Sequence, residues 1–415
     1  MNFDDTPAEA AFRAEARAWI RDNAPHELHD ELAAAGFGQH ALRSRDLMSA
    51  ARAWQQRKHA AGWACLHWPR EYGGRGATPI ERVIWDQEEG VYGKLSRVFI
   101  IGHGMCGPTV MAYADEAQKR RLLPPLAAGR EVWCQMFSEP AAGSDLAGLR
   151  TRAVRDGDDW IVDGQKIWTS GAHLSDWGIL LVRTDPEVPK HEGLTMFFVD
   201  MRSPGIEIRP IRQVNGDSHF NEVFFDGLRI PDHQRLGAVG AGWRVSLHTL
   251  MNERLSIGAG MPTGFPQLLE LCCRLETGEG RAVDDPAVRA RLATWAVRTS
   301  GLKYTAWRSI SALSRGEMPG PENSIGKLVA GRTLQEIAAF ALDLQGRAGV
   351  LADPTLAEAG AAFQAMLMRS PATRIEGGTD EILRNVIAER VLGLPADLRA
   401  DRGIPFSAVP TGGGR

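Results

Sequence analysis

The first part of the chain carries apolar residues at helical spacing. They recur over residues 8–60, then from Val83 to Val91 and from Asp115 to Leu126, without a run that alternates like a strand. The segment from Trp68 to Gly76 interrupts this pattern, because its proline and glycines cannot continue a helix. The pattern predicts an N-terminal helical domain over residues 1–132.

The period then changes to that of short apolar strands. Such runs follow at Trp160–Val162, Lys166–Trp168, Ile179–Val182, Met196–Val199, Ile206–Ile208 and Val223–Phe225. The pairs Asp163-Gly164 and Asp226-Gly227 are typical of hairpin turns. These features predict a middle domain over residues 133–238 that is an antiparallel β-barrel or sandwich.

Helical spacing returns near residue 243 and holds almost to the end of the chain. Asp285-Pro286 is typical of an N-cap followed by proline in the first helical turn, and Thr379 is suited to cap the last helix. We expect a C-terminal four-helix bundle over residues 239–395 and a flexible tail over 396–415. The predicted fold class is therefore α+β, mostly α.

Composition and charge narrow the class of protein. The 415 residues are 44% hydrophobic and 24% charged, which is typical of a globular chain. The net charge of -3 provides no overall field that would attract nucleic acid or an anionic membrane. The five cysteines lack metal-ligand spacing, so we expect no metal site. Since the sequence shows neither an export signal nor a run of roughly 20 apolar residues, we expect a cytoplasmic protein.

Two segments carry residue types that suit ligand chemistry. Ser138–Asp145 reads Ser-Glu-Pro-Ala-Ala-Gly-Ser-Asp, and its small residues let the backbone approach a ligand while offering N–H and hydroxyl donors. Gly164–Gly171 reads Gly-Gln-Lys-Ile-Trp-Thr-Ser-Gly and ends a strand in an aromatic ring and two hydroxyls. Taken singly, the first segment is typical of a tight loop, and a lone tryptophan such as that in the second is typical of a core.

Together these segments resemble the acyl-CoA dehydrogenase family, whose members carry a Ser/Thr-Glu-Pro-x-Ala-Gly-Ser-Asp loop followed by a Lys-x-Trp-x-Thr/Ser strand at this separation. Trp68–Gly76 is similar to the family's WPxEYGGxG loop, and Gly377–Pro395 to its last helix. The resemblance covers about residues 5–395. It implies FAD between the β domain and the C-terminal helices. It further implies dehydrogenation of an acyl-CoA of lipid metabolism, such as fatty acid β-oxidation, to the trans-2-enoyl-CoA, with electrons passed to an electron-transfer flavoprotein.

The resemblance also implies roles for particular residues. In the β domain it places the flavin against Phe137, Ser138, Trp168 and Ser170. In the C-terminal region the matching FAD contacts are Gly346, Gly349, Thr379 and Glu381. The positions that match contacts to the acyl-CoA substrate are Ser144, Arg254 and Gly377. Hydroxyl donors suit an electron-rich reduced flavin, for which the protein supplies orientation.

The catalytic base is not at the position that most relatives use. That position precedes a Gly-Thr pair, and here Gly377 occupies it, while Glu376 lies one residue too early. A second subset of the family carries its glutamate on the first helix after the β domain, just before an arginine, and this matches Glu253-Arg254. The resemblance favours Glu253 as the base and leaves Glu376 as the alternative; an ordinary solvated or salt-bridged helix glutamate is the non-functional reading of Glu253.

Two departures concern the part of the FAD site that one subunit lends to another in the family. Where relatives have an arginine four residues before a Gly-Lys/Arg pair, this chain has Glu276 before Gly280-Arg281. The Gln-x-x-Gly-Gly-x-Gly segment is degraded to Asp343–Gly349. The sequence therefore leaves open a homo-oligomer, dimer or tetramer, and a hetero-oligomer with a sister subunit. An oxygen-reactive oxidase or monooxygenase and a non-catalytic subunit remain the alternative functions.

Overall fold

The computed structural model describes residues 4–39, 41–42, 46–257, 262–278, 280–317, 320–398 and 401–410, and the side chains of 254–257 are not described. The chain forms two compact units, each built from segments that are distant in the sequence. The first unit comprises Met1–Ala50, Thr78–Leu95 and Ile257–Ala396. The second comprises Ala51–Ala77, Ser96–Ser256 and Asp397–Arg415. The domain limits expected from the sequence place all the N-terminal helices in one domain, whereas the two units divide these helices between them. The expected limits stay a prediction.

The first unit is helical. Its helices are α1 (Pro7–Asn23), α2 (His29–Ala34), α4 (Pro79–Glu89), α9 (Phe265–Arg274), α10 (Pro286–Ser314), α11 (Ser324–Leu344), α12 (Ala362–Thr373) and α13 (Asp380–Arg390). The Asp285 side chain accepts hydrogen bonds from the N–H groups of Ala287 and Val288, and the Thr379 hydroxyl accepts one from Ile382 N–H. Both predicted N-caps are therefore confirmed.

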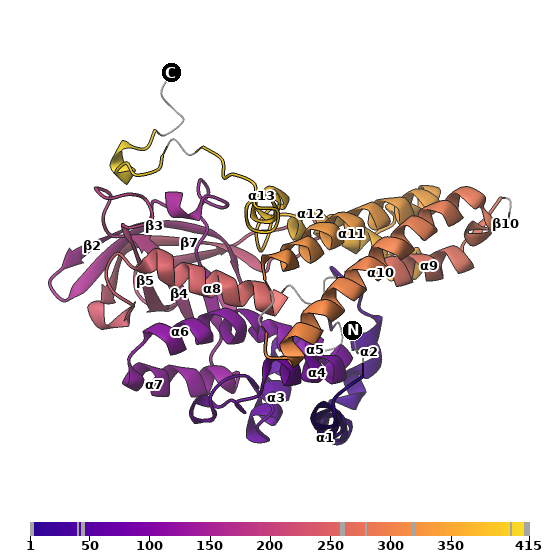
Figure 1. The fold of residues 1–415 in the computed structure, drawn as a ribbon, viewed down its shortest axis with the longest axis horizontal. Helices are drawn as coiled ribbons and strands as arrows, with labels where there is room; N and C mark the ends of the chain where they lie inside the picture. The colour runs from indigo at the N-terminus through magenta and orange to yellow at the C-terminus, as the bar shows by residue number, and fades with distance from the viewer. Residues whose placement is uncertain are drawn as a thin grey trace. The chain divides into compact units, whose positions relative to one another are not determined.

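The core of this unit is a four-helix bundle, as predicted. Helices α9, α10, α11 and α12 contribute its buried side chains, among them Leu271, Trp295, Ile337 and Phe363. The long helices α10 and α11 lie side by side (Figure 1). No helix in the described ranges is both long enough and apolar enough to cross a bilayer.

The second unit contains an eight-stranded sheet and the helices that cover it (Figure 1). Its strands are β1 (Trp133–Met136), β2 (Arg152–Asp156), β3 (Asp159–Ser170), β4 (Trp177–Arg183), β5 (Leu194–Asp200), β6 (Ile206–Pro210), β7 (Phe220–Pro231) and β8 (Arg235–Leu236). The helices are α6 (Gly107–Tyr113), α7 (Glu116–Ala127) and α8 (Gly242–Ile257), with most of α3 (Leu47–Ala60). The short α5 (Gly93–Ser96) spans the boundary with the first unit, and the hairpin β9 (Glu276–Thr277) and β10 (Gly280–Arg281) belongs to that first unit.

The sheet order is β6-β7-β3-β2-β4-β5-β8, and β1 pairs with β4 outside this path. The pairs are antiparallel except for β1 with β4 and β2 with β4, which are parallel. One face of β4 and β5 packs on α6, α7 and α8 through residues such as Leu181 and Val245. The other face packs within the sheet against β3 and β7, through residues such as Leu180 and Val223.

Neither predicted Asp-Gly hairpin turn is a turn. Asp163-Gly164 lies inside β3 and Asp226-Gly227 inside β7, where the two long strands face each other across a register shift. Gly164 has φ +148, and a Cβ there would meet the Thr151 hydroxyl at 2.6 Å. Glycine is therefore needed for a bulge and a close approach of strands. The β2–β3 hairpin turns instead at Gly157, which has φ +63.

Candidate functional site

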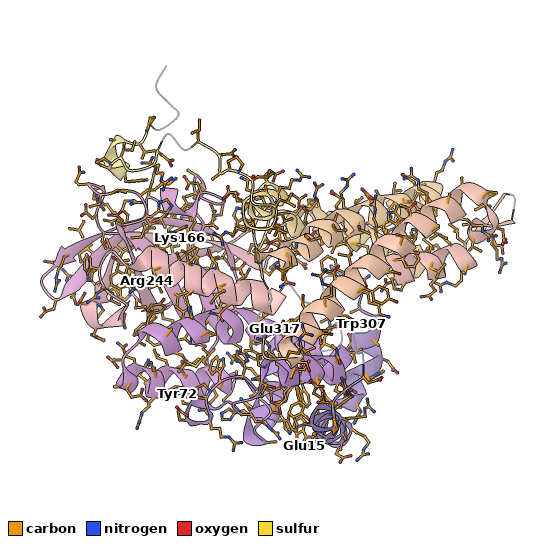
Figure 2. The ribbon with its side chains drawn as sticks, viewed as in Figure 1. Glu15, Tyr72, Lys166, Arg244, Trp307 and Glu317 are labelled. Carbon is orange, nitrogen blue, oxygen red and sulfur yellow. The ribbon has the colours of Figure 1, made fainter. Side chains whose placement is uncertain are left out.

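The Ser138–Asp145 loop is held by a buried ion pair. The Glu139 carboxylate accepts hydrogen bonds from the backbone N–H of Arg150 at 2.6 Å and of Thr151 at 2.9 Å. It also lies 2.8 Å from the ammonium of Lys166, which donates a further bond to the Phe137 carbonyl at 3.0 Å. Lys166 is labelled in Figure 2. Because its side chain is fully buried, this charge has no access to water and depends on Glu139.

Burial and pairing act in opposite directions on these two groups. Burial lowers the pKa of Lys166 to about 8, although Glu139 opposes that shift. Burial alone would raise the pKa of Glu139, but Lys166 and the donors from Thr151 and Arg150 outweigh it and hold the pKa below its usual value. Glu139 is therefore charged at neutral pH and fixes the loop in place.

The loop and β3 bring four of the predicted flavin contacts together. The Ser138 carbonyl accepts a 2.9 Å hydrogen bond from the backbone N–H of Ile167, which places Ser138 beside Trp168. Phe137 is buried one residue before, whereas Ser138 and Ser170 are partly exposed. In the described part of the chain, the hydroxyls of Ser138 and Ser170 have no hydrogen-bond partner, so both are available to a ligand.

Trp168 has an unusual backbone and an unusual exposure. Its φ is +61, and its side chain is 55% exposed while the ring meets Phe220 edge-on at 5.9 Å. A positive φ is a real outlier for a bulky residue and costs about 1–2 kcal/mol. The strain accompanies a register shift between Lys166 and Thr169. As a result Trp168 points outward and Thr169 inward, so the tryptophan is not the core residue that its type alone would indicate.

This strain predicts a difference between two variants that both lose the indole. We expect Trp168→Gly to be more stable to unfolding than Trp168→Ala by about 1 kcal/mol, since only glycine tolerates the positive φ without cost. Chemical denaturation checks this, and flavin-to-protein ratios measured on the same samples should fall equally in both variants. Equal stability of the two variants would show that the backbone relaxes without the tryptophan.

Glu253 lies in the same unit as this cluster. Its carboxylate is within 3.4 Å of the Gln135 amide nitrogen on β1, and Gln135 shares its strand face with Phe137. One turn earlier on α8, the buried Thr249 hydroxyl bonds the Thr109 hydroxyl of α6 at 2.8 Å. The helix end that carries Glu253 is thus anchored next to β1. Arg254 follows on α8, but its side chain is outside the described residues.

Glu376, the alternative base, is engaged elsewhere. Both of its oxygens lie within 2.8 Å of one Arg369 guanidinium nitrogen. Gly377 and Gly378 follow with φ of +63 and +94, and Lys327 donates to the Gly378 carbonyl. Arg369 thus already holds the Glu376 carboxylate in a partly buried ion pair.

The predicted FAD contacts of the first unit lie at the ends of α11 and α13. Thr379 uses its hydroxyl as the α13 N-cap, and Glu381 is exposed in the first turn of that helix. Gly346 has φ +56 after α11, and a Cβ on Gly349 would meet the Leu342 carbonyl at 2.4 Å. Backbone geometry alone therefore explains both glycines. The two units are described separately, so these residues are not placed relative to Trp168 or Glu253.

Sequence reasoning missed roles for Gln135, Glu139 and Lys166. Lys166 lies at an even number of residues from the buried Trp160 and Val162, so strand alternation places it on the same inward face. A lysine that faces inward indicates a buried partner for its charge. Gln135 lies two residues from each of the buried aromatic residues Trp133 and Phe137, so it is a polar group on an otherwise apolar strand face. Ser144, by contrast, is exposed at the surface of its loop, as a CoA contact requires.

The chain thus combines a β module, in which a strained and exposed tryptophan lies beside two hydroxyls without a partner in the described residues, with a four-helix bundle. Three family models match this chain and together span most of it. They are the acyl-CoA dehydrogenase N-terminal domain at residues 6–130, middle domain at 134–228 and C-terminal domain at 240–392. The chain therefore belongs to the acyl-CoA dehydrogenase family, a family of oxidoreductases whose cofactor is FAD.

Individual relatives extend over almost the whole chain. Acyl-CoA dehydrogenase IpdE1 of Mycobacterium tuberculosis is 38% identical over 395 residues, which are 94% of this chain and 98% of the relative. A chain of the ChsE4-ChsE5 complex from Mycobacterium tuberculosis is 29% identical, with a TM-score of 0.78 over 96% of this chain and 100% of that chain. A chain described as Tcur3481-Tcur3483 steroid ACAD is 28% identical, with a TM-score of 0.78 and the same coverage.

Proposed function

We propose that this chain catalyses the α,β-dehydrogenation of an acyl-CoA thioester, with Glu253 as the base and an electron-transfer flavoprotein as the electron acceptor. The observation that carries the proposal is the position of Glu253, which contacts Gln135 on the strand leading into the Phe137–Ser138 wall. A carboxylate so placed can take the α-proton of a thioester that lies along this wall. The expected product is the trans-2-enoyl-CoA.

The residues of the β module fit the FAD that the family uses. Ser138 and Ser170 offer hydroxyl donors without partners in the described residues, and Trp168 presents an aromatic face at a strained, exposed position. Buried Phe137 lies directly beside Ser138. When bound, FAD supplies the acceptor for the hydride that leaves the β-carbon. The chain's own part is to orient the thioester, hold donors toward the ring and receive the α-proton.

On the substrate side, we propose that Ser144 contacts the pantetheine part of CoA, with Arg254 and Gly377 as further contacts. The loop that carries Ser144 is exposed at that residue, and the hydrogen bonds of Glu139 hold the start of the loop in place. One solved relative is described as a steroid ACAD. We therefore extend the proposal to a steroid-derived acyl group rather than a straight fatty acyl chain.

We also propose a hetero-oligomer with a sister chain. Glu276 is exposed on the β9–β10 hairpin and pairs in register with Arg281, so it offers a negative charge where relatives place an arginine for the FAD pyrophosphate. Two solved relatives are described by the names of two chains, ChsE4-ChsE5 and Tcur3481-Tcur3483. A sister chain that carries the arginine would complete the site that this chain lacks.

The visible spectrum of the chain purified alone tests the assembly. We expect a flavin-to-protein ratio well below one for the chain alone and a higher ratio after co-purification with its sister chain. The reason is that the phosphate-facing charge at Glu276 is reversed. Native mass measurement of a fully flavinated homo-oligomer would contradict the hetero-oligomer.

Substrate turnover tests the reaction itself. Anaerobic addition of a steroid-derived acyl-CoA to the loaded protein should bleach the flavin band, with straight-chain acyl-CoA as the comparison. Rapid hydrogen peroxide formation in air would instead identify the oxidase alternative. Failure of every acyl-CoA to reduce a fully loaded flavin would leave the non-catalytic subunit as the function.

A further inference from the structure

The segment 401–410 crosses the β module as a strap that is bonded along its length. The backbone N–H of Phe406 donates to the Val188 carbonyl at 2.9 Å, and that of Ser407 to the Pro186 carbonyl at 2.8 Å. The Ser407 hydroxyl also donates to the Glu187 carboxylate at 3.1 Å. The strap therefore pairs with the loop that joins β4 to β5. Phe406 is buried there, with 9% of its surface exposed.

Phe406 covers a buried arginine that holds the residues after the Ser138–Asp145 loop. The Arg183 guanidinium carbon lies 3.5 Å from the centre of the Phe406 ring, and Arg183 donates to the carbonyls of Ala147 at 2.6 Å and Leu149 at 3.1 Å. The ring shields one face of the cation from water. Shielding strengthens the hydrogen bonds that Arg183 makes on its edge.

A second connection runs through Lys190, which is only 11% exposed at its side chain. Its ammonium lies 2.8 Å and 2.9 Å from the two Asp145 oxygens, and it also bonds Asp401 of the strap. Asp145 itself is 62% exposed and is the last residue of the loop, directly after Ser144. The strap thus reaches the end of the loop from two sides, through Asp401 and through Phe406.

We propose that the strap holds the Ser144 end of the Ser138–Asp145 loop in the conformation that binds acyl-CoA, with Asp401 and Phe406 as positioning residues. The inference rests on the proposed function, because that function makes CoA the ligand of Ser144. Glu139 fixes the start of the loop and the strap fixes its end. A loop held at both ends loses less conformational freedom when the thioester binds, which improves binding without changing the chemical step.

The test compares Asp401→Asn and Phe406→Ala with a matched control, all in the full-length, flavin-loaded protein assembled with its sister chain where one is required. The control is Asp156→Asn, which makes the same change of side chain at an ion pair with Arg229 elsewhere in the module, one that is more exposed than the Asp401–Lys190 pair. We expect each strap variant to raise KM for the acyl-CoA about fivefold, with kcat and flavin content unchanged. The control should leave KM unchanged.

Hydrogen exchange provides a readout that does not depend on turnover. The N–H groups of Gly148 and Leu149 close the turn after Asp145, and they should exchange faster in both strap variants than in the control. Unchanged KM and unchanged exchange would overturn the inference, as would a loss of kcat together with flavin. If the wild type turns over no acyl-CoA, the proposed function fails, and the exchange rates still decide whether the strap fixes the loop.

Discussion

Glu253→Gln is expected to lower turnover of the acyl-CoA by about a thousandfold while FAD stays bound. The amide is almost isosteric with the carboxylate and can still contact Gln135, but it cannot accept the α-proton, and general-base catalysis contributes about 10²–10⁴-fold. Stopped-flow measurement of flavin reduction under anaerobic conditions reports the chemical step directly. The flavin spectrum of the same sample shows whether the cofactor remains.

Glu376→Gln is the informative comparison. Since Glu376 is bound by Arg369, its removal should cost stability through the unpaired, partly buried guanidinium and should change the rate of flavin reduction little. Near-normal reduction in Glu253→Gln with a collapse in Glu376→Gln would move the base to the first unit. Collapse in both variants, with flavin retained, would show that the two carboxylates act together.

Breaking the buried ion pair is expected to have the largest effect on stability. Lys166→Met or Glu139→Gln should each lower the free energy of unfolding by about 3–5 kcal/mol, because each leaves the other charged group buried without its partner. Urea denaturation measures this loss. Flavin should be lost as well, because Lys166 holds the Phe137 carbonyl and Glu139 holds the loop.

The double variant Glu139→Gln/Lys166→Met separates charge burial from other causes. It should recover much of the stability lost by either single variant, since neither Glu139 nor Lys166 is then left charged without the other. Destabilisation of the double variant equal to the sum of the singles would show that the pair acts through packing and not through charge.

The same pair predicts an acid limb in the stability of the wild type. The folded-state pKa of Glu139 lies below its unfolded value near 4.5, so its stabilisation is complete above that pH and is lost as the pH falls through the folded pKa. The free energy of unfolding should therefore fall more steeply with acidification in the wild type than in the neutral double variant. Urea titrations at several pH values between 3 and 6 would reveal parallel slopes if Glu139 were not responsible.

Local hydrogen bonding is what made much of the helical fold predictable. Asp285 and Thr379 cap helices with their own side chains, and the helix beginning at Pro79 follows a capping box at Thr78. In contrast, Asp163-Gly164 has the composition of a hairpin turn but lies in a bulge of a long strand. Pairing with β7, a strand that is remote in the sequence, is what makes Asp163-Gly164 a bulge and not a turn.

For the candidate site, the sequence predicted residues but not their geometry, and their roles stay a prediction. The motif around Ser138 and Trp168 identified the family, but strand alternation from Lys166 would have placed Trp168 in the core. The positive φ of Trp168 reverses that alternation, and the residue types in the sequence do not indicate such a φ. Likewise, the contact between Gln135 and Glu253 joins β1 to α8, and only the tertiary fold brings them together.

The pairing of β3 also sets the order in which the candidate site around Ser138 and Trp168 can form during synthesis. β2 and β3 make a local hairpin, but β3 gains its second neighbour only when Ser170 meets Phe220 and Asp159 meets Pro231. β1 likewise waits for β4, since Trp133 pairs with Trp177. A nascent chain must therefore expose the edge of β3 that carries Trp168 until β7 has left the ribosome. The candidate site around Ser138 and Trp168 then forms late in folding, and aggregation would compete at this stage.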